Sequence, residues 1–387
     1  MPGKHLAEKP RGRAKARPAA AVLTLLCLLL SLAMLPALAL TVHPSSSASL
    51  GAGSTSIASV DKLDLYANNV ASEALSGLTY IRKIYTIDDS ATKGYVPNPD
   101  CYGTTTDPAE VATVVAECGE LLDGQELSWN EDIELRPDSS IIWYADETIL
   151  MISWQEVRNS SVYNFVEVKI AHPSQFRRML AGDSYGDSIQ RSAKGMATDA
   201  NAVVAANADF YAFRTSGVNV YQGMLYRCLG KTLDTCFICG NGDLHMVHAG
   251  EITSEADAEA IIEEYDVDFS LSFGPIEVEN GEVITSSSYS IGEVNDNYSR
   301  ASLGQLGELH YMIMTCGADG GYRSGATIVQ AAAVMAEKGC VSAYALDGGQ
   351  TAEIVINNKI RNRIVFDSER YTSDIIYFAT AIPDGGE

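Results

Sequence analysis

The chain has few basic residues for its length. Among 387 residues, 27 lysines and arginines stand against 50 aspartates and glutamates, which gives a formal charge of −23. No basic patch of the kind that neutralises phosphates along a nucleic acid is visible. An acidic surface of this strength suits a soluble domain and repels anionic polymers. We therefore exclude nucleic acid as a partner.

Several catalytic motifs are also missing. There is no Gly-x-Ser-x-Gly nucleophile elbow and no phosphate-binding P-loop, which argues against a serine hydrolase of the α/β type and an NTPase. The six histidines form no His-x-x-x-His or His-Glu-x-x-His pair. Among the eight cysteines, Cys236 and Cys239 have CxxC spacing, but no second pair lies near them. Buried thiols or one local disulfide are therefore favoured over a zinc or redox site.

The first sixty residues divide into three stretches. Residues 1–20 are basic and predict a cytoplasmic tail, and residues 21–40 are apolar without a charge, long enough for a transmembrane signal anchor. A cleaved signal peptide is the alternative, because Ala37-Leu38-Ala39 resembles a cleavage site, and the protein is then secreted. Residues 41–60, rich in Ser, Ala and Gly, predict a flexible linker. In both cases the remaining chain is expected outside the membrane, in an extracytoplasmic location.

The hydrophobic pattern then predicts an α+β fold. Residues 61–140 mix short helical and irregular pieces, including a helix over 107–123 that begins at Asp107-Pro108, and we interpret them as an N-terminal extension. Residues 141–387 form the main domain in this interpretation. Its expected elements are strands at 140–143, 149–154, 162–170, 201–206, 266–273 and 375–380, and a helix from Ser254, with a capping box to Asp257, through Glu264.

The stretch 309–349 carries the strongest functional signal. Apolar runs at 309–315 and 341–346 enclose a helical pattern at 327–338, which predicts a βαβ crossover with parallel strands and hence a mixed sheet. Asp319 follows the first strand and Asp347 the second. Because ligands bind at the carboxyl edge of parallel strands, we expect the active site there.

Asp209 follows a third apolar run in the same manner. Paired carboxylates can act as general acid and base, or as nucleophile, on a glycosidic bond. Three carboxylates also suit a divalent cation, since hard cations prefer oxygen ligands. The alternative is ordinary turn chemistry, because Asp-Gly is a common turn sequence. Arg300 and Arg370 are candidate phosphate ligands, with a surface ion pair as the competing interpretation of each.

Taken together, these stretches resemble the phosphodiester glycosidase family. Asn207-Ala208-Asp209-Phe210-Tyr211 is similar to its Asn-Gly-Asp/Gly-Phe-Tyr/Phe motif, and Leu346-Asp347-Gly348-Gly349 to its Leu-Asp-Gly-Gly. The other similar stretches, in family order, are 167–177, 272–275, 300–304, 319–320, 325–327 and 370–378. The resemblance covers roughly residue 166 to the C-terminus.

The resemblance implies an extracytoplasmic glycosidase that hydrolyses a sugar-1-phosphodiester of the N-acetylglucosamine type in envelope or extracellular glycans. It implies Asp209 and Asp347 as the catalytic pair with Asp319 in support, and a phosphate on Arg300. It further implies a pocket shaped by the polar and glycine positions Asn207, Gly223, Gly348 and Gly349, with Arg370 as a further ligand.

The sequence departs from the family pattern at several positions. Ala208 stands where Gly is usual, and Ala301 stands where Thr is usual. Gly321 replaces an Arg, for which Arg323 is a possible substitute. The last motif is altered at Ala345, Gln350 and Thr351. Two alternatives therefore stay open. One is a non-catalytic protein that binds glycans or assembles envelope polysaccharide. The other is a metal-dependent phosphodiesterase.

Overall fold

The computed structural model describes residues 85–182, 185–186, 189–284, 289, 294–317 and 324–383. All of them belong to one compact unit, Arg82–Glu387. The expected tail, anchor and linker in residues 1–60 lie outside the described residues, as do Asp319, Gly321 and Arg323. Within the described ranges, no helix has the length and apolar character needed to cross a membrane.

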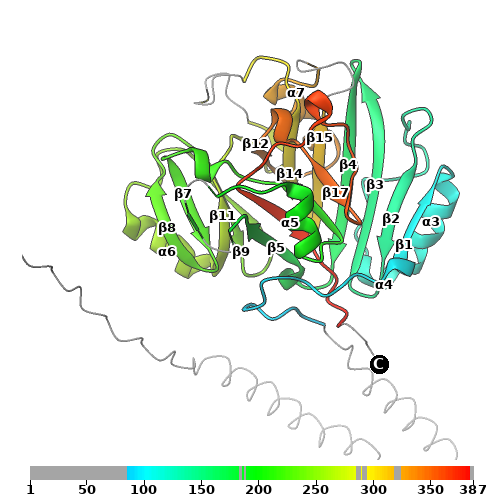
Figure 1. Cartoon of the computed structure of the whole chain (residues 1–387), viewed down its shortest axis with the longest axis horizontal. Helices are drawn as coiled ribbons and strands as arrows, with labels where there is room; N and C mark the ends of the chain where they lie inside the picture. The colour runs from blue at the N-terminus through cyan, green and yellow to red at the C-terminus, as the bar shows by residue number, and fades with distance from the viewer. Residues whose placement is uncertain are drawn as a thin grey trace, which may run out of the picture. The chain divides into compact units, whose positions relative to one another are not determined.

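A nine-stranded sheet forms the larger layer of this unit (Figure 1). Its order is β1-β2-β3-β4-β15-β14-β16-β12-β13, and each neighbouring pair is antiparallel. Its strands are β1 (Tyr102–Thr105), β2 (Ile141–Ala145), β3 (Ile149–Arg158), β4 (Ser161–Ile170), β12 (Ile276–Glu279), β13 (Glu282–Val283), β14 (Arg300–Gly307), β15 (His310–Cys316) and β16 (Ser342–Leu346).

Two five-stranded antiparallel sheets pack against one face of the large sheet. One has the order β18-β17-β6-β19-β5 and the other β10-β9-β11-β7-β8. The strands of the first are β5 (Phe176–Leu180), β6 (Val204–Asn207), β17 (Ile354–Ile356), β18 (Lys359–Ile360) and β19 (Asp374–Phe378). The strands of the second are β7 (Gly217–Tyr221), β8 (Met224–Leu229), β9 (Thr235–Cys239), β10 (Leu244–Val247) and β11 (Val267–Leu271).

The helices cover the outer faces of these sheets, so the central strands are buried on both sides. α3 (Pro108–Glu117), α4 (Gly119–Leu122) and α7 (Ile328–Glu337) lie on the large sheet, while α5 (Ala193–Asp199) and α6 (Glu255–Tyr265) each cover one smaller sheet. Burial on both faces explains the unbroken apolar runs in β15 and β16. The single-turn 3₁₀ helices are η1 (Pro99–Cys101), η2 (Pro173–Gln175), η3 (Tyr211–Phe213), η4 (Gly349–Thr351) and η5 (Val365–Asp367).

The main core lies where the three sheets meet. Phe176 is its centre: its ring stacks on Phe378 at 4.6 Å between centroids and meets Phe269 edge-on at 5.5 Å. Tyr311 of the large sheet closes the group at 5.0 Å from Phe176. Each sheet contributes at least one of these rings, and aromatic pairs of this geometry add to the gain from burial. The core therefore holds the three sheets in fixed relative positions at the site described below.

The predicted α+β class is confirmed, and the two strands of the predicted crossover run in the same direction as expected, but they are not neighbours in the sheet. β14 lies between β15 and β16 and pairs antiparallel with both. β15 and β16 therefore run in the same direction without touching, and the sheet is antiparallel among the described strands. The helical crossover predicted at 327–338 is present as α7. The sequence could not reveal that β14 lies between β15 and β16, because β14 precedes both strands in the chain.

The strand registers nevertheless bring the ends of β15 and β16 to the same edge of the sheet, as the crossover predicted. Arg300 is opposite Cys316 at the end of β15, and Ala301 is opposite Leu346 at the end of β16. The beginning of β14 and the ends of β15 and β16 therefore share one edge of the sheet. Arg300 thus lies beside the turn that begins at Asp347.

Among the other local predictions, the helix that begins at Ser254 is confirmed as α6. The capping box that begins α6 forms between Ser254 and Asp257, with a hydrogen bond of 3.2 Å from Asp257 N to Ser254 Oγ. In the predicted N-terminal extension, β1 continues the large sheet as its first strand. Cys236 and Cys239 are buried free thiols on β9, and no disulfide links any of the described cysteines.

Candidate active site

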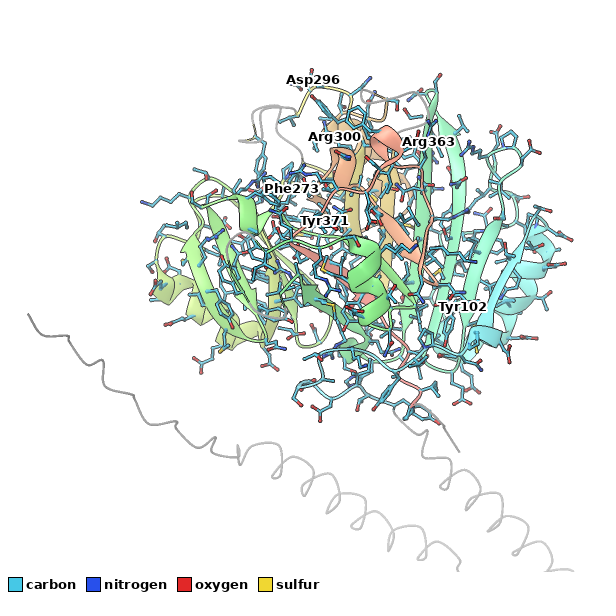
Figure 2. The ribbon with its side chains drawn as sticks, in the orientation of Figure 1. Tyr102, Phe273, Asp296, Arg300, Arg363 and Tyr371 are labelled. Carbon is cyan, nitrogen blue, oxygen red and sulfur yellow. The ribbon has the colours of Figure 1, made fainter. Side chains whose placement is uncertain are left out.

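A pocket of about 400 Å³ opens at the sheet edge where β14 begins and β16 ends. Its lining combines three arginines, one carboxylate, four aromatic rings, two glycines and one amide. These residues are Phe210, Arg214, Phe273, Tyr298, Arg300, Asp347, Gly348, Gly349, Gln350, Phe366 and Arg370. The pocket thus brings together Asp347, Arg300, Gly348, Gly349 and Arg370 from the sequence prediction (Figure 2 labels Arg300 and Phe273).

The backbone around Asp347 is held from two sides. Its N–H donates to the carbonyl of Ala208 at 3.0 Å, and its carbonyl accepts from Asn207 Nδ2 at 2.5 Å. Gly348 passes so close to the neighbouring chain that a Cβ there would lie 2.6 Å from the carbonyl oxygen of Ser299. Gly349 N–H donates to that same oxygen at 2.8 Å. The turn therefore requires glycine at 348, and it fixes the Asp347 side chain in the pocket.

The Asp347 carboxyl is buried, with 7% of the residue exposed. Its Oδ2 atom has no hydrogen-bond partner in the described part of the chain. Burial raises the pKa of this carboxyl to about 7, although the Thr351 hydroxyl and the charges of Arg370 and Arg214 offset part of the rise. A carboxyl that titrates near neutral pH can both accept and donate a proton.

Arg300 reaches the pocket from the first position of β14. Its Nε donates to the Ala326 carbonyl at 2.9 Å and its Nη2 to the Asp296 carbonyl at 2.8 Å. The guanidinium carbon also lies 5.5 Å from the ring centre of Tyr298. These contacts fix the orientation of the guanidinium.

Arg214 and Arg370 are held by aromatic rings. The guanidinium carbon of Arg214 lies 4.6 Å from the ring centre of Phe273 and 5.4 Å from that of Phe210. Arg370 lies 5.6 Å from Phe210 and 5.4 Å from Phe213. Such stacking preorganises a guanidinium for a ligand at low entropic cost.

Arg214 is a pocket residue that the sequence pattern did not predict. It lies five residues after Asp209, on the same loop, and it is separated from the other pocket arginines by more than 80 positions. The sequence does show that Arg214 directly follows the aromatic run Phe210-Tyr211-Ala212-Phe213, which indicates possible stacking. Only the fold shows that its partners are Phe210 and Phe273.

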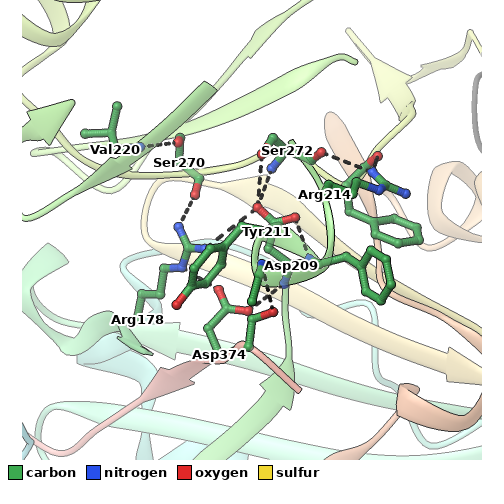
Figure 3. A network of polar contacts seen from close by, with 12 residues as sticks. Arg178, Asp209, Tyr211, Arg214, Val220, Ser270, Ser272 and Asp374 are labelled. Carbon is green, nitrogen blue, oxygen red and sulfur yellow. Dashed lines mark hydrogen bonds and ion pairs between the residues drawn. The ribbon is translucent and has the colours of Figure 1, made fainter. Parts of the chain in front are cut away.

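Asp209 lies in a buried polar network outside the pocket lining (Figure 3). Its Oδ2 accepts from Ser272 N at 2.9 Å and from Ser272 Oγ at 3.1 Å, and its Oδ1 accepts from Phe210 N at 2.7 Å. Arg178 Nη2 is 3.7 Å from Oδ2, and Arg178 Nε makes a 2.5 Å ion pair with Asp374. Both carboxylate oxygens of Asp209 are therefore engaged by other groups of the protein.

Two other predicted residues also lie outside the pocket lining. Asn207 is fully buried, and its Oδ1 accepts from Glu353 N at 2.9 Å while its Nδ2 holds the Asp347 carbonyl. Gly223 forms the turn between β7 and β8 at φ +70°. Asn207 therefore positions the site through the backbone, and Gly223 shapes a hairpin.

In the part of the chain that the structure describes, no group of three or more His, Cys, Asp or Glu side chains is arranged to hold a metal ion. Of the three predicted carboxylates, Asp347 lines the pocket and Asp209 belongs to the neighbouring network, while Asp319 lies outside the described residues. The assembled groups can hold an anion on the arginines, place an apolar ring face against the aromatic walls and transfer a proton at Asp347.

Comparison with protein families gives a match to the phosphodiester glycosidase model over residues 200–379. Comparison with curated proteins gives no match. Among solved structures, the chain is similar to the zebrafish N-acetylglucosamine-1-phosphodiester alpha-N-acetylglucosaminidase catalytic domain, auto-inhibited by its pro-peptide. The two share 15% identity over 60% of this chain and 83% of that one, with a TM-score of 0.49. A hypothetical protein from Synechocystis shares 13% identity over 60% of this chain and 62% of its own, with a TM-score of 0.45.

Proposed function

We propose that this chain is a hydrolase acting on a sugar phosphodiester, because its residues 200–379 match the phosphodiester glycosidase family model. The bond cleaved in this proposal joins C1 of the sugar to a phosphate oxygen, and the products are the free sugar and a phosphomonoester. The substrate class, a sugar-1-phosphodiester of the N-acetylglucosamine type, is part of the proposal.

The observation that carries the proposal is the combination of one titratable carboxyl with three guanidinium groups in one pocket. Arg214, Arg300 and Arg370 give the pocket a positive charge in a chain whose formal charge is −23. Arginine matches the geometry of phosphate oxygens, because it presents parallel N–H donors. A positive pocket in an acidic protein therefore favours a phosphate-bearing substrate.

The pocket size and walls suit a sugar next to that phosphate. A volume of about 400 Å³ is at the small end of the range for ligand sites, which fits one sugar ring with its phosphate. Phe210, Phe273 and Phe366 supply apolar surface for the faces of the ring. The group esterified on the far side of the phosphate then extends toward solvent.

We also propose an extracytoplasmic location, with residues 21–40 as the membrane anchor. This part of the proposal depends on the basic stretch 1–20 followed by an uncharged apolar stretch. Cell fractionation with protease treatment of intact cells tests it. Loss of the domain after external protease is expected, and complete protection would contradict it.

Product identification tests the reaction. The purified protein is incubated with an N-acetylglucosamine-1-phosphodiester, and the products are identified by mass, with Asp347→Asn and EDTA-treated protein in parallel. Free sugar from the wild type and none from Asp347→Asn supports the glycosidase. Sugar 1-phosphate lost on EDTA treatment indicates a metal-dependent phosphodiesterase instead. Binding without any product, retained in Asp347→Asn, indicates a glycan-binding protein.

A further inference from the structure

The proposed reaction changes the charge of the phosphate, and this inference depends on that proposed function. A phosphodiester carries one negative charge near neutral pH. When the bond from C1 to its oxygen breaks, the electron pair stays on the phosphate oxygen and the leaving phosphomonoester carries two. An active site complementary to the transition state therefore needs positive charge beyond that required to bind the substrate.

The pocket contains such an excess of positive charge. Arg214 and Arg370 make no ion pair with a carboxylate in the described part of the chain, and both stack on Phe210. Arg300 adds a third guanidinium, and Asp347 is the one carboxylate among the described residues of the lining. Even with Asp347 ionised, these lining groups have a surplus of positive charge.

The buried network behind the pocket does not cancel this surplus. Asp209 and Asp374 share Arg178, which is 3.7 Å from one carboxylate and 2.5 Å from the other. Asp209 accepts three further hydrogen bonds from Ser272 and Phe210. Its charge is therefore stabilised locally, and among the described residues it forms no ion pair with Arg214 or Arg370.

We infer that Arg214 and Arg370 hold the leaving phosphate as a dianion, so that Asp347 acts as a carboxylate on the attacking water. In this step Asp347 accepts one proton from water, the resulting hydroxide forms the bond to C1, and the phosphate leaves with the electron pair of the broken bond. The total charge is conserved: the carboxylate becomes neutral while the phosphate gains one negative charge.

Leaving-group chemistry supports this division of roles. The second pKa of a phosphomonoester is about 6, so at neutral pH the departing oxygen is stable without a proton. A general acid on that oxygen, which ordinary glycosides require, therefore gains little here. This explains how one pocket carboxyl and a set of arginines could suffice for the reaction.

The pH dependence separates the two possible roles of Asp347. As a base it must be ionised, so kcat/KM for a phosphodiester is expected to rise tenfold per pH unit below about 7 and to level off above it. As a general acid it must be protonated, and kcat/KM would then fall above about 7. A fall above pH 7 overturns the inference, while the proposed hydrolase stands.

Substrates with different leaving groups test the arginine clamp, that is, the pair Arg214 and Arg370 that holds the leaving phosphate. Arg214→Gln is expected to lower kcat for a sugar phosphodiester by about 10², but to change hydrolysis of an aryl glycoside of the same sugar less than threefold. Arg214→Lys, which keeps a charge, retains an intermediate rate. Arg363→Gln is the matched control, because Arg363 is exposed, pairs with Asp367 at 2.8 Å and does not line the pocket. Equal losses on both substrates overturn the inference.

The product provides an independent readout. Wild type is expected to bind the phosphomonoester product at least tenfold more tightly than the corresponding methyl phosphodiester at pH 8, and Arg214→Gln is expected to abolish this preference. Calorimetric titration measures both affinities. Equal affinities in the wild type overturn the clamp. Failure of the wild type to hydrolyse any sugar phosphodiester refutes the proposed function and this inference together.

Discussion

Replacing Asp347 with asparagine is expected to abolish activity and to stabilise the fold at the same time. The carboxyl is buried, its Oδ2 has no hydrogen-bond partner in the described structure, and its pKa is raised from 3.8 to about 7. Folding must therefore desolvate a charge wherever this group is ionised. An asparagine of the same shape removes that charge and its cost.

The size of the stabilisation follows from the two pKa values. An acid whose folded pKa is above its unfolded pKa is neutral in both states below pH 3.8, where it costs nothing. Between pH 3.8 and 7 the unfolded state ionises and the folded state does not, so stability falls by about 1.4 kcal/mol per pH unit. The cost is therefore about 2 kcal/mol at pH 5 and reaches about 4 kcal/mol at pH 8 as an upper limit.

Urea unfolding of wild type and Asp347→Asn at pH 5 and pH 8 measures this cost. The free energy of unfolding of the variant should exceed that of the wild type at both pH values, with the larger excess at pH 8. A gain of the same size at both pH values, or a loss at pH 8, would refute the reasoning. Asp209→Asn is the matched control: Asp209 accepts three hydrogen bonds and is 3.7 Å from Arg178, so its loss should destabilise the fold by about 2–4 kcal/mol.

Three further predictions concern the frame of the pocket. Gly348→Ala should lower kcat/KM by about 10², because its Cβ would lie 2.6 Å from the Ser299 carbonyl; Gly119→Ala, where a Cβ meets nothing within 4 Å, should leave the rate unchanged. Asn207→Ala should lower the free energy of unfolding by about 3 kcal/mol in urea, because two buried backbone groups lose their partner. Arg370→Gln should raise the Kd for a phosphodiester measured by calorimetry while changing stability by less than about 0.5 kcal/mol, since Arg370 is exposed; unchanged Kd would contradict its role.

The sequence was most informative where local chemistry decides the structure. The helix at 327–338, the capping box at Ser254 and the apolar runs that became β15 and β16 depend on residues close together in the chain. The turn at Asp347-Gly348 belongs to the same class, because Asp-Gly is a common turn sequence. Such features can be read from neighbouring residues alone.

Sheet order and the division of labour among the carboxylates could not be read in this way. β14 enters between β15 and β16 although it precedes both in the chain, and no periodicity specifies that order. Asp209 and Asp347 follow similar apolar strands, yet Arg178 and Ser272, from distant segments, engage the first and leave the second facing the pocket. In the proposed function, environment rather than residue type therefore separates a structural carboxylate from a reactive one.

The departures from the family pattern also take a different meaning once they are placed in the fold. Ala208, Ala301 and Ala345 are buried and lie outside the pocket lining, and the first of them contributes its backbone carbonyl to hold Asp347. A small side chain is what these packed positions accommodate, so the substitutions need not remove a ligand contact. Gln350 is the departure among the described residues that lines the pocket, which makes it the position where altered specificity is to be sought. Replacing Gln350 with glycine, the residue usual in the family motif, should therefore change the preference among sugars while leaving the pH dependence set by Asp347 intact. A shift of the pH profile without a change in sugar preference would refute this assignment.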